Sequence, residues 1–81
     1  MNIKITLYYH LKEKAGTGNL EMSLPEQSTI KDLKHLLENR FPALRTHLDN
    51  VMILMDKKIV LDEDKIKNNS EIAFLTPVGG G

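Results

Sequence analysis

The stretch Ser28–Phe41, STIKDLKHLLENRF, decides the fold, because it is the one long helical pattern between two groups of strand patterns. Thr29 followed by Asp32 is a form of the capping box that begins a helix. Pro42 disfavours continuation, because the residue before a proline is pushed out of the α region. We expect a helix over about 29–40. Its apolar residues follow the three-four spacing of an amphipathic helix, at Ile30, Leu33, Leu36, Leu37 and Phe41.

Two strand patterns precede this helix. Asn2–Tyr9 (NIKITLYY) alternates with period two, which predicts a strand with Ile3, Ile5, Leu7 and Tyr9 on one face. Leu20–Leu24 (LEMSL) alternates again, and Gly16–Asn19 between them is typical of a turn. These patterns predict an antiparallel hairpin.

Three more strand patterns follow the helix and a short helical turn, at 51–55 (VMILM), 59–61 (IVL) and 71–76 (EIAFLT). The first is a continuous apolar run, typical of a strand covered on both faces, so Met52 and Met55 are interpreted as core residues. Asp56–Lys58 and Asn68–Ser70 are expected turns.

The order of elements, β-β-α-β-β-β, predicts an α+β fold. A mixed sheet of about five strands, packed on one main helix on one face, is the β-grasp arrangement of ubiquitin-like domains. We expect the last strand to be central, with Phe74 in the core. The domain would cover residues 1–76, followed by a flexible C-terminal Gly-Gly tail at 77–81.

Composition excludes several classes of function. The 11 basic and 11 acidic residues give a formal net charge of zero, which argues against nucleic-acid binding. No apolar run reaches the roughly 20 residues of a membrane span, and no signal peptide is visible, so we expect a cytoplasmic protein without membrane contact. There is no cysteine, which excludes a disulfide scaffold, a thiolate zinc site and a thiol nucleophile.

The usual catalytic patterns are missing from the sequence. The histidines lack the spacing of a metal site, so none is expected, and Asp62–Asp64 is interpreted as a solvated turn because a calcium loop needs a glycine and a later glutamate. The histidines concerned are His10, His35 and His47. Side-chain catalysis therefore has no support.

The last residues, Thr76–Gly81 (TPVGGG), need an explanation of their own, because glycine is the costliest residue to order. A frayed terminus and a linker remnant are two ordinary explanations. The third is that the free carboxylate of Gly81 is the working group.

A resemblance favours the third explanation. The ending EIAFLTPVGGG resembles that of the MoaD family, the small sulfur-carrier subunits of molybdopterin synthase. The stretch IKITLYYHLKEKAGT at 3–17 is similar to the start of that family, which implies an apolar strand followed by a short helical segment and a Gly-Thr turn. Thr76 departs from the pattern, where a first proline is usual, and Gly79 gives a triple-glycine end that is also common in ThiS carriers. The residues in register are Glu71, Ile72, Ala73, Phe74, Leu75, Pro77, Val78, Gly80 and Gly81.

The resemblance implies a reaction cycle. An ATP-dependent activating enzyme of the MoeB type would adenylate Gly81, and a persulfide donor would convert it to a thiocarboxylate. A large subunit of the MoaE type, in a heterotetramer of two small and two large subunits, would then use the sulfur to build the dithiolene of molybdopterin. This chain would bind no cofactor and would be the non-catalytic subunit.

The chemistry of the tail agrees with this cycle. Gly81 leaves the acyl carbon unhindered, and Gly79 and Gly80 let the backbone enter a slot too narrow for a Cβ. Pro77 and Val78 form the root, which proline holds extended. Residues 77–81 reach about 17 Å, at about 3.3–3.6 Å each. That reach is enough to enter a partner's active site.

A carrier also needs a docking face. Alternation turns Tyr8 away from the predicted core strand face and Leu75 away from Phe74, and Ile59 is a third candidate whose face the sequence leaves open. Contacts of the MoaD family fall at matching positions. Several apolar residues on one uncovered face indicate a partner surface, although scattered surface apolar residues are the ordinary alternative.

Two other functions remain open. One is a ThiS-like sulfur carrier for thiamine or another route, against which Pro77 and Val78 weigh. The other is a ubiquitin-like modifier joined to lysines through Gly81, or a pure interaction module. A modifier would give covalent adducts of higher mass, and an interaction module would tolerate loss of the glycines.

Overall fold

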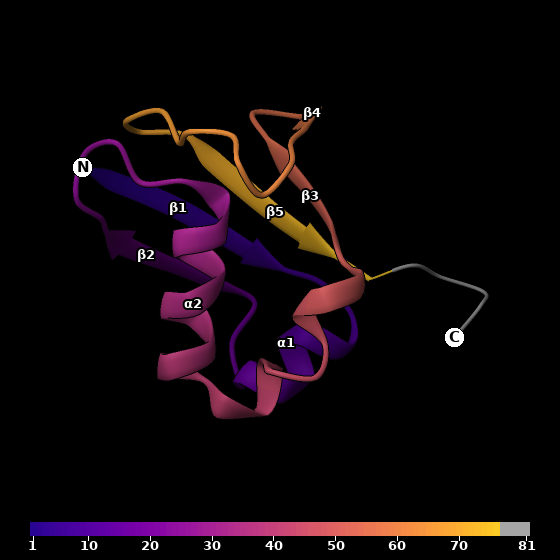
Figure 1. Cartoon of the computed structure of the whole chain (residues 1–81). Coiled ribbons are helices and arrows are strands. Elements are labelled where there is room, and N and C mark those ends of the chain that lie inside the picture. The colour runs from indigo at the N-terminus through magenta and orange to yellow at the C-terminus, as the bar shows by residue number, and fades with distance from the viewer. Residues whose placement is uncertain (77–81) are drawn as a thin grey trace.

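The computed structural model describes residues 1–76, and it contains a mixed sheet of five strands in the order β2-β1-β5-β3-β4, with helices on one face (Figure 1). The predicted β-grasp fold is confirmed, including the central position of the last strand. Residues 77–81 lie outside the described part. The elements are β1 Asn2–Leu7, α1 His10–Ala15, β2 Asn19–Ser23, α2 Ile30–Arg40, the 3-10 helices η1 Pro42–Leu44 and η2 Leu48–Asn50, β3 Met52–Met55, β4 Lys58–Ile59 and β5 Glu71–Leu75.

The first two strands pair antiparallel, as predicted, with Ile5 opposite Leu20. Their connection is more than a turn, because it contains the short helix α1, which buries Leu11 under the sheet. Gly16 ends this helix with φ 77°, a left-handed conformation in which glycine carries no Cβ penalty. The residues themselves predicted the turn, and the resemblance of 3–17 to the start of the MoaD family implied the short helix, which is confirmed.

Helix α2 begins and ends where its sequence predicts. Thr29 caps it, with its hydroxyl accepting from the Asp32 N–H at 3.3 Å while the Asp32 carboxylate accepts from the Thr29 N–H at 3.0 Å. Phe41 is the residue beyond its last turn, and Pro42 starts η1.

The loop before β5 holds the start of α2 in place. The first two amides of the helix, those of Ile30 and Lys31, donate to the carbonyls of Asp64 and Asp62, both at 3.0 Å. A salt bridge of 2.7 Å between the Lys34 ammonium and the Asp62 carboxylate adds a side-chain contact between the same segments. Donors that a helix end leaves unsatisfied are thus paired by a distant loop.

Strands β3 and β4 are joined by a two-residue turn in which both residues have positive φ. Asp56 has φ 50° and Lys57 has φ 71°, the backbone of the primed turns that fit the twist of a hairpin. The turn was predicted at this place, but β4 is Lys58–Ile59 rather than 59–61. Asn69, with φ 63°, makes the predicted turn before β5.

The core lies between the sheet and the helices. Phe74 has no exposed surface, as predicted. Met55 packs against the core, but the interpretation of Met52 is wrong, because half of its surface (50%) is exposed. The buried apolar residues are Ile3, Ile5, Leu7, Leu11, Leu24, Ile30, Leu33, Leu37, Leu44, Leu48, Ile53, Ile66, Ile72 and Phe74.

The capping box gives a stability prediction. Replacing Thr29 by Ala removes the hydroxyl that accepts from Asp32, and we expect a loss of about 1 kcal/mol in the free energy of unfolding. For a domain of this size, that corresponds to a melting temperature lower by about 4–8 °C. The control is Thr46→Ala in the exposed turn between η1 and η2. Calorimetry showing equal losses for the two variants would contradict the prediction.

Candidate functional site

The sheet has a second face that no helix of the described chain covers. Strand alternation and register place Leu75 opposite Met52, Ala73 opposite Leu54, and Leu54 in turn opposite Ile59, all on this open face. The Tyr8 N–H donates to the Phe74 carbonyl at 3.2 Å and so continues the ladder of β1 by one residue. Tyr8 therefore shares the face of Lys4 and Thr6, which is the open one.

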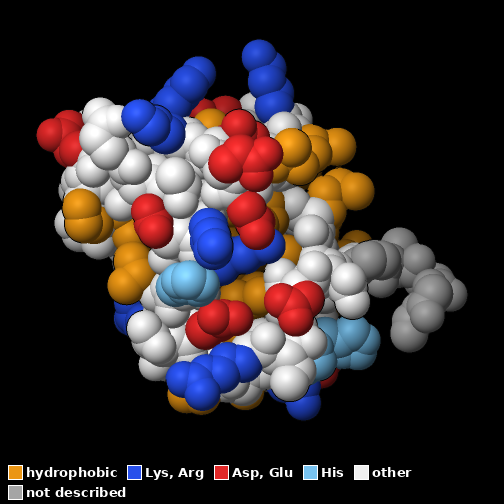
Figure 2. All heavy atoms as spheres, viewed as in Figure 1, with side chains coloured by type: hydrophobic (Ala, Val, Ile, Leu, Met, Phe, Trp, Pro, Cys, Tyr) orange, Lys and Arg blue, Asp and Glu red, His pale blue; other side chains and the backbone are white. Residues whose placement is uncertain are grey.

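We call the apolar residues of this face the apolar patch. Its exposed members are substantially accessible, at 41% for Tyr8, 50% for Met52 and 67% for Ile59. From β1 to β4 the patch extends about 14 Å across neighbouring strands. Figure 2 views the molecule from the side of the helices, opposite to this face, and shows charged side chains of both signs interspersed there. The patch consists of Tyr8, Met52, Leu54, Ile59, Ala73 and Leu75.

The structure thus brings together the residues that the sequence indicated for a docking face, Tyr8, Ile59 and Leu75. It also adds Met52 and Leu54, which sequence analysis missed. The available signal was the unbroken apolar run at 51–55, interpreted as a strand buried on both faces. The run has a second explanation, since an apolar outer face is equally expected where a partner covers it.

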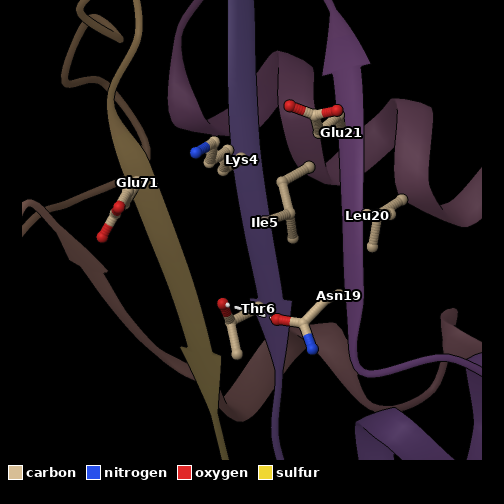
Figure 3. A pocket seen from close by; sticks show the side chains of 7 residues that line it. All are labelled: Lys4, Ile5, Thr6, Asn19, Leu20, Glu21 and Glu71. Atoms are coloured by element: carbon tan, nitrogen blue, oxygen red, sulfur yellow. Dashed lines mark hydrogen bonds between the residues drawn. The ribbon is translucent and has the colours of Figure 1, made fainter.

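The other half of the open face is polar. A depression of about 400 Å³ lies over β1, β2 and β5 (Figure 3). Lys4 is in register with Glu21 on one side and with Glu71 on the other. The Thr6 hydroxyl and the Asn19 side chain are 3.4 Å apart. The charges of this half alternate in sign along the row, as in an ordinary solvated sheet surface.

Beyond β1 the chain makes a strained turn. Tyr9 has φ 53° and ψ −126°, and the Leu11 N–H donates to the Tyr8 carbonyl at 3.1 Å, which is the geometry of a II′ turn with Tyr9 where glycine is preferred. Such a residue costs about 1–3 kcal/mol. The expectation that Tyr9 continues the core face of the strand is wrong, because the strand ends at Leu7.

This turn lies at the end of the sheet where the tail begins. Strands β1 and β5 are parallel, so their carboxyl ends are neighbours, and Figure 1 shows the chain passing from β1 to α1 beside the end of β5. The apolar patch reaches the same end through Tyr8 and Leu75. The predicted tail residues Pro77, Val78, Gly79, Gly80 and Gly81 lie outside the described residues.

Within residues 1–76, no three His, Asp or Glu side chains gather in a way that could hold a metal ion. Neither α1 nor α2 is long and apolar enough to cross a membrane, and the same holds for every helix found in residues 1–76.

Comparison of the sequence with known proteins identifies a family and a named relative. The model of the ThiS family matches residues 5–81. The molybdopterin synthase sulfur carrier subunit of Dictyostelium discoideum is 32% identical over 81 aligned residues, which cover 96% of this chain and 94% of that protein.

Solved structures agree on the fold. SAMP1 of Haloferax volcanii superposes with a TM-score of 0.90 at 21% identity, covering 100% of both chains. A complex of subunits 1 and 2 of the molybdopterin-converting factor of Helicobacter pylori contains a chain with a TM-score of 0.74 at 20% identity, again covering 100% of both.

The strained turn gives a second stability prediction. Tyr9→Gly and Tyr9→Ala both remove the ring, but only alanine keeps a Cβ in the unfavourable conformation. We expect the glycine variant to be more stable by about 1 kcal/mol, since strain relief exceeds the 0.4–1 kcal/mol by which glycine favours the unfolded chain. At Tyr8, whose φ is not positive, the order should reverse. Urea denaturation that ranks alanine above glycine at both positions would refute the strain.

Proposed function

This chain belongs to the ThiS family, and we propose that it is the sulfur-carrier subunit of a molybdopterin synthase, acting through the carboxylate of Gly81. The observation that carries the proposal is the end of the sheet. The central strand β5 leads into the Pro-Val-Gly-Gly-Gly sequence beside an uncovered apolar patch. The name of the Dictyostelium relative, which aligns over nearly the whole of both chains, supports this choice among the functions of the family.

The chain itself supplies the acyl group that carries the sulfur. With no cysteine in the sequence, no side-chain thiol can carry the sulfur, and the main-chain carboxylate of Gly81 is the acyl group proposed to hold it. Adenylation converts that poor electrophile into a good one, with AMP as the leaving group. A sulfur donor of the persulfide class then attacks the acyl adenylate and displaces AMP, which gives an acyl disulfide. A thiol of the donor cleaves the S–S bond of this intermediate, which leaves the thiocarboxylate on Gly81 and a disulfide on the donor. Glycine at positions 79–81 keeps the acyl carbon open to attack from either side.

The apolar patch is the proposed docking face for the large subunit. Specific interfaces have a central set of large apolar residues that lose their water on binding. The patch provides such a set through Leu75, Met52 and Ile59, in the middle and at the β4 side of the open face. The Helicobacter chain with the same fold was solved in complex with its subunit 2, which supports a partner of that kind.

The remaining parts of the cycle are proposals that rest on this function. The chain binds no cofactor, and the ATP belongs to an activating enzyme of the MoeB type. The assembly with the large subunit is a heterotetramer of two small and two large subunits. The protein works in the cytoplasm, where ATP for the activation step is available.

The central test alters the length of the tail. Deleting Gly81 leaves the buried core, which ends at Phe74, complete, so we expect the melting temperature to stay the same. The terminal carboxylate would fall about 3.3–3.6 Å short of its reacting position. Because a misplacement of ~1 Å can cost on the order of a hundredfold in rate, thiocarboxylate formation and sulfur transfer should be lost. Adding one residue after Gly81 should be as damaging.

Intact mass spectrometry measures the first step, as the replacement of one oxygen by sulfur after incubation with ATP, activating enzyme and a persulfide donor. The unaltered chain is the control. Near-normal conversion of the shortened or the extended chain would reject the proposal. Covalent adducts of higher mass in lysate, in place of a free thiocarboxylate, would indicate a protein modifier instead.

The docking face is tested by Leu75→Glu. A charge placed in a desolvated contact is left unpaired, and we expect the dissociation constant for the large subunit to rise by about tenfold or more. The matched control is Ser23→Glu, which puts the same charge on the open face at the outer strand β2. Calorimetric titration should separate the two variants. Equal affinities for both, with circular dichroism unchanged, would remove Leu75 from the interface.

A further inference from the structure

Tyr9 occupies a position that folding alone does not explain. The turn from Tyr8 to Leu11 needs positive φ at its second residue, and glycine would provide it without strain. Tyr9 stands there with φ 53°. A bulky residue held in a glycine-favoured conformation is a reason to look for a function at that residue.

The side chain of Tyr9 contributes little to the stability of the fold. Tyr9 is 55% exposed and belongs to neither the buried core nor the residues packed against it. It precedes α1 directly, yet its side chain makes no capping hydrogen bond. The neighbour that anchors this turn from inside is Leu11, which is fully buried.

What the turn achieves is the placement of a second ring beside the first. The ring centroids of Tyr8 and Tyr9 lie 6.1 Å apart with an angle of 43° between the planes. Tyr8 is fixed to β5 by its N–H bond to the Phe74 carbonyl. The ring pair therefore stands at the carboxyl end of the two central parallel strands, where the register of Leu7 with Phe74 brings Tyr8 level with Leu75.

We propose that Tyr9 is a positioning residue that extends the apolar patch beyond Tyr8, at the end of the sheet where β5 ends, and contacts an apolar surface of the large subunit there. The inference rests on the proposed function, and the occupant it commits to is the large subunit. The argument for that occupant is continuity, since the ring of Tyr9 adjoins Tyr8, which is a member of the patch.

The physical advantage is pre-organisation. A tyrosine ring offers a large contact area and few rotatable bonds, and a turn with a fixed backbone loses little further freedom when it binds. A contact at the root of the tail also fixes the point from which residues 77–81 extend. A displacement of that point would displace the acyl carbon as well, and a misplacement of about 1 Å at the reacting atom can lower the rate substantially.

The experiment compares Tyr9→Ala, Tyr9→Gly and Tyr9→Phe in the full chain, with its C-terminus converted to the thiocarboxylate. The readouts are the dissociation constant for the large subunit and the single-turnover rate of sulfur transfer. We expect both ring-less variants to bind about tenfold more weakly, as for a truncated interface anchor. Tyr9→Phe should bind within about twofold of the unaltered chain, because the ring carries the contact.

The glycine variant separates this role from a structural one. A merely structural tyrosine would make binding follow stability, so that Tyr9→Gly, with its strain relieved, binds better than Tyr9→Ala. The proposal requires the two to bind equally weakly. Ring-less variants that bind and react like the unaltered chain would overturn it, as would a Tyr9→Phe variant as weak as Tyr9→Ala.

Failure of the proposed function gives a different result. In that case the unaltered chain itself would acquire no sulfur and bind no large subunit, and the inference about Tyr9 would be overturned with it. If the unaltered chain does both and the ring-less variants match it, only the inference about Tyr9 fails.

Discussion

The pairing of β5 between β1 and β3 is the interaction on which the rest of the molecule depends. Strand β5 is the last strand along the described chain, yet it lies in the middle of the sheet, parallel to β1 and antiparallel to β3. Its backbone polar groups are then paired on both sides, and its inward residues Ile72 and Phe74 close the core over the helices. Without β5, the β1–β2 and β3–β4 pairs would have no common sheet. The tail thus starts from the most firmly held strand.

One face of that sheet is enough for stability, and the other is free for recognition. The helices cover the inner face, where Phe74, Leu33 and Leu37 are fully buried. Residues 1–76 contain no further helix with which to cover the outer face, so the side chains on that face meet either water or a partner. The half with alternating charges suits water, and the apolar half, with Met52, Ile59 and Leu75, suits a partner. Tyr9 extends the apolar half of this face to the turn beyond β1. Its strained backbone lies at the end of the sheet from which the tail continues.

Much of the fold was predictable because its signals are local. Helix α2 (Ile30–Arg40) was predictable from a capping box, a three-four apolar spacing and a proline. The alternation of β1 and the polar residues at 56–57 and 68–70 identify strands and turns within a few residues of sequence. Helix α1 was predicted only through the family resemblance, because its six residues bury only Leu11, too little for a periodic signal. The docking residues were only partly predictable, since an apolar run such as VMILM is the same whether a helix or another protein covers its outer side.

The sequence by itself determined the main helix, the positions of most strands along the chain and the chemical identity of its end, because each depends on residue type and local spacing. The central place of β5 was expected only because the order β-β-α-β-β-β is that of the β-grasp fold, and it consists of long-range pairings. Only the tertiary structure decided which apolar residues are covered. The face of Ile59 depends on the two-residue turn that sets its register with Leu54, and the exposure of Met52 depends on the absence of a second layer over the described sheet. The strain at Tyr9 also belongs to the tertiary structure. It arises because β1 is held by Phe74 on one side of the turn while Leu11 is buried on the other, and no local pattern in LYYHL specifies that combination.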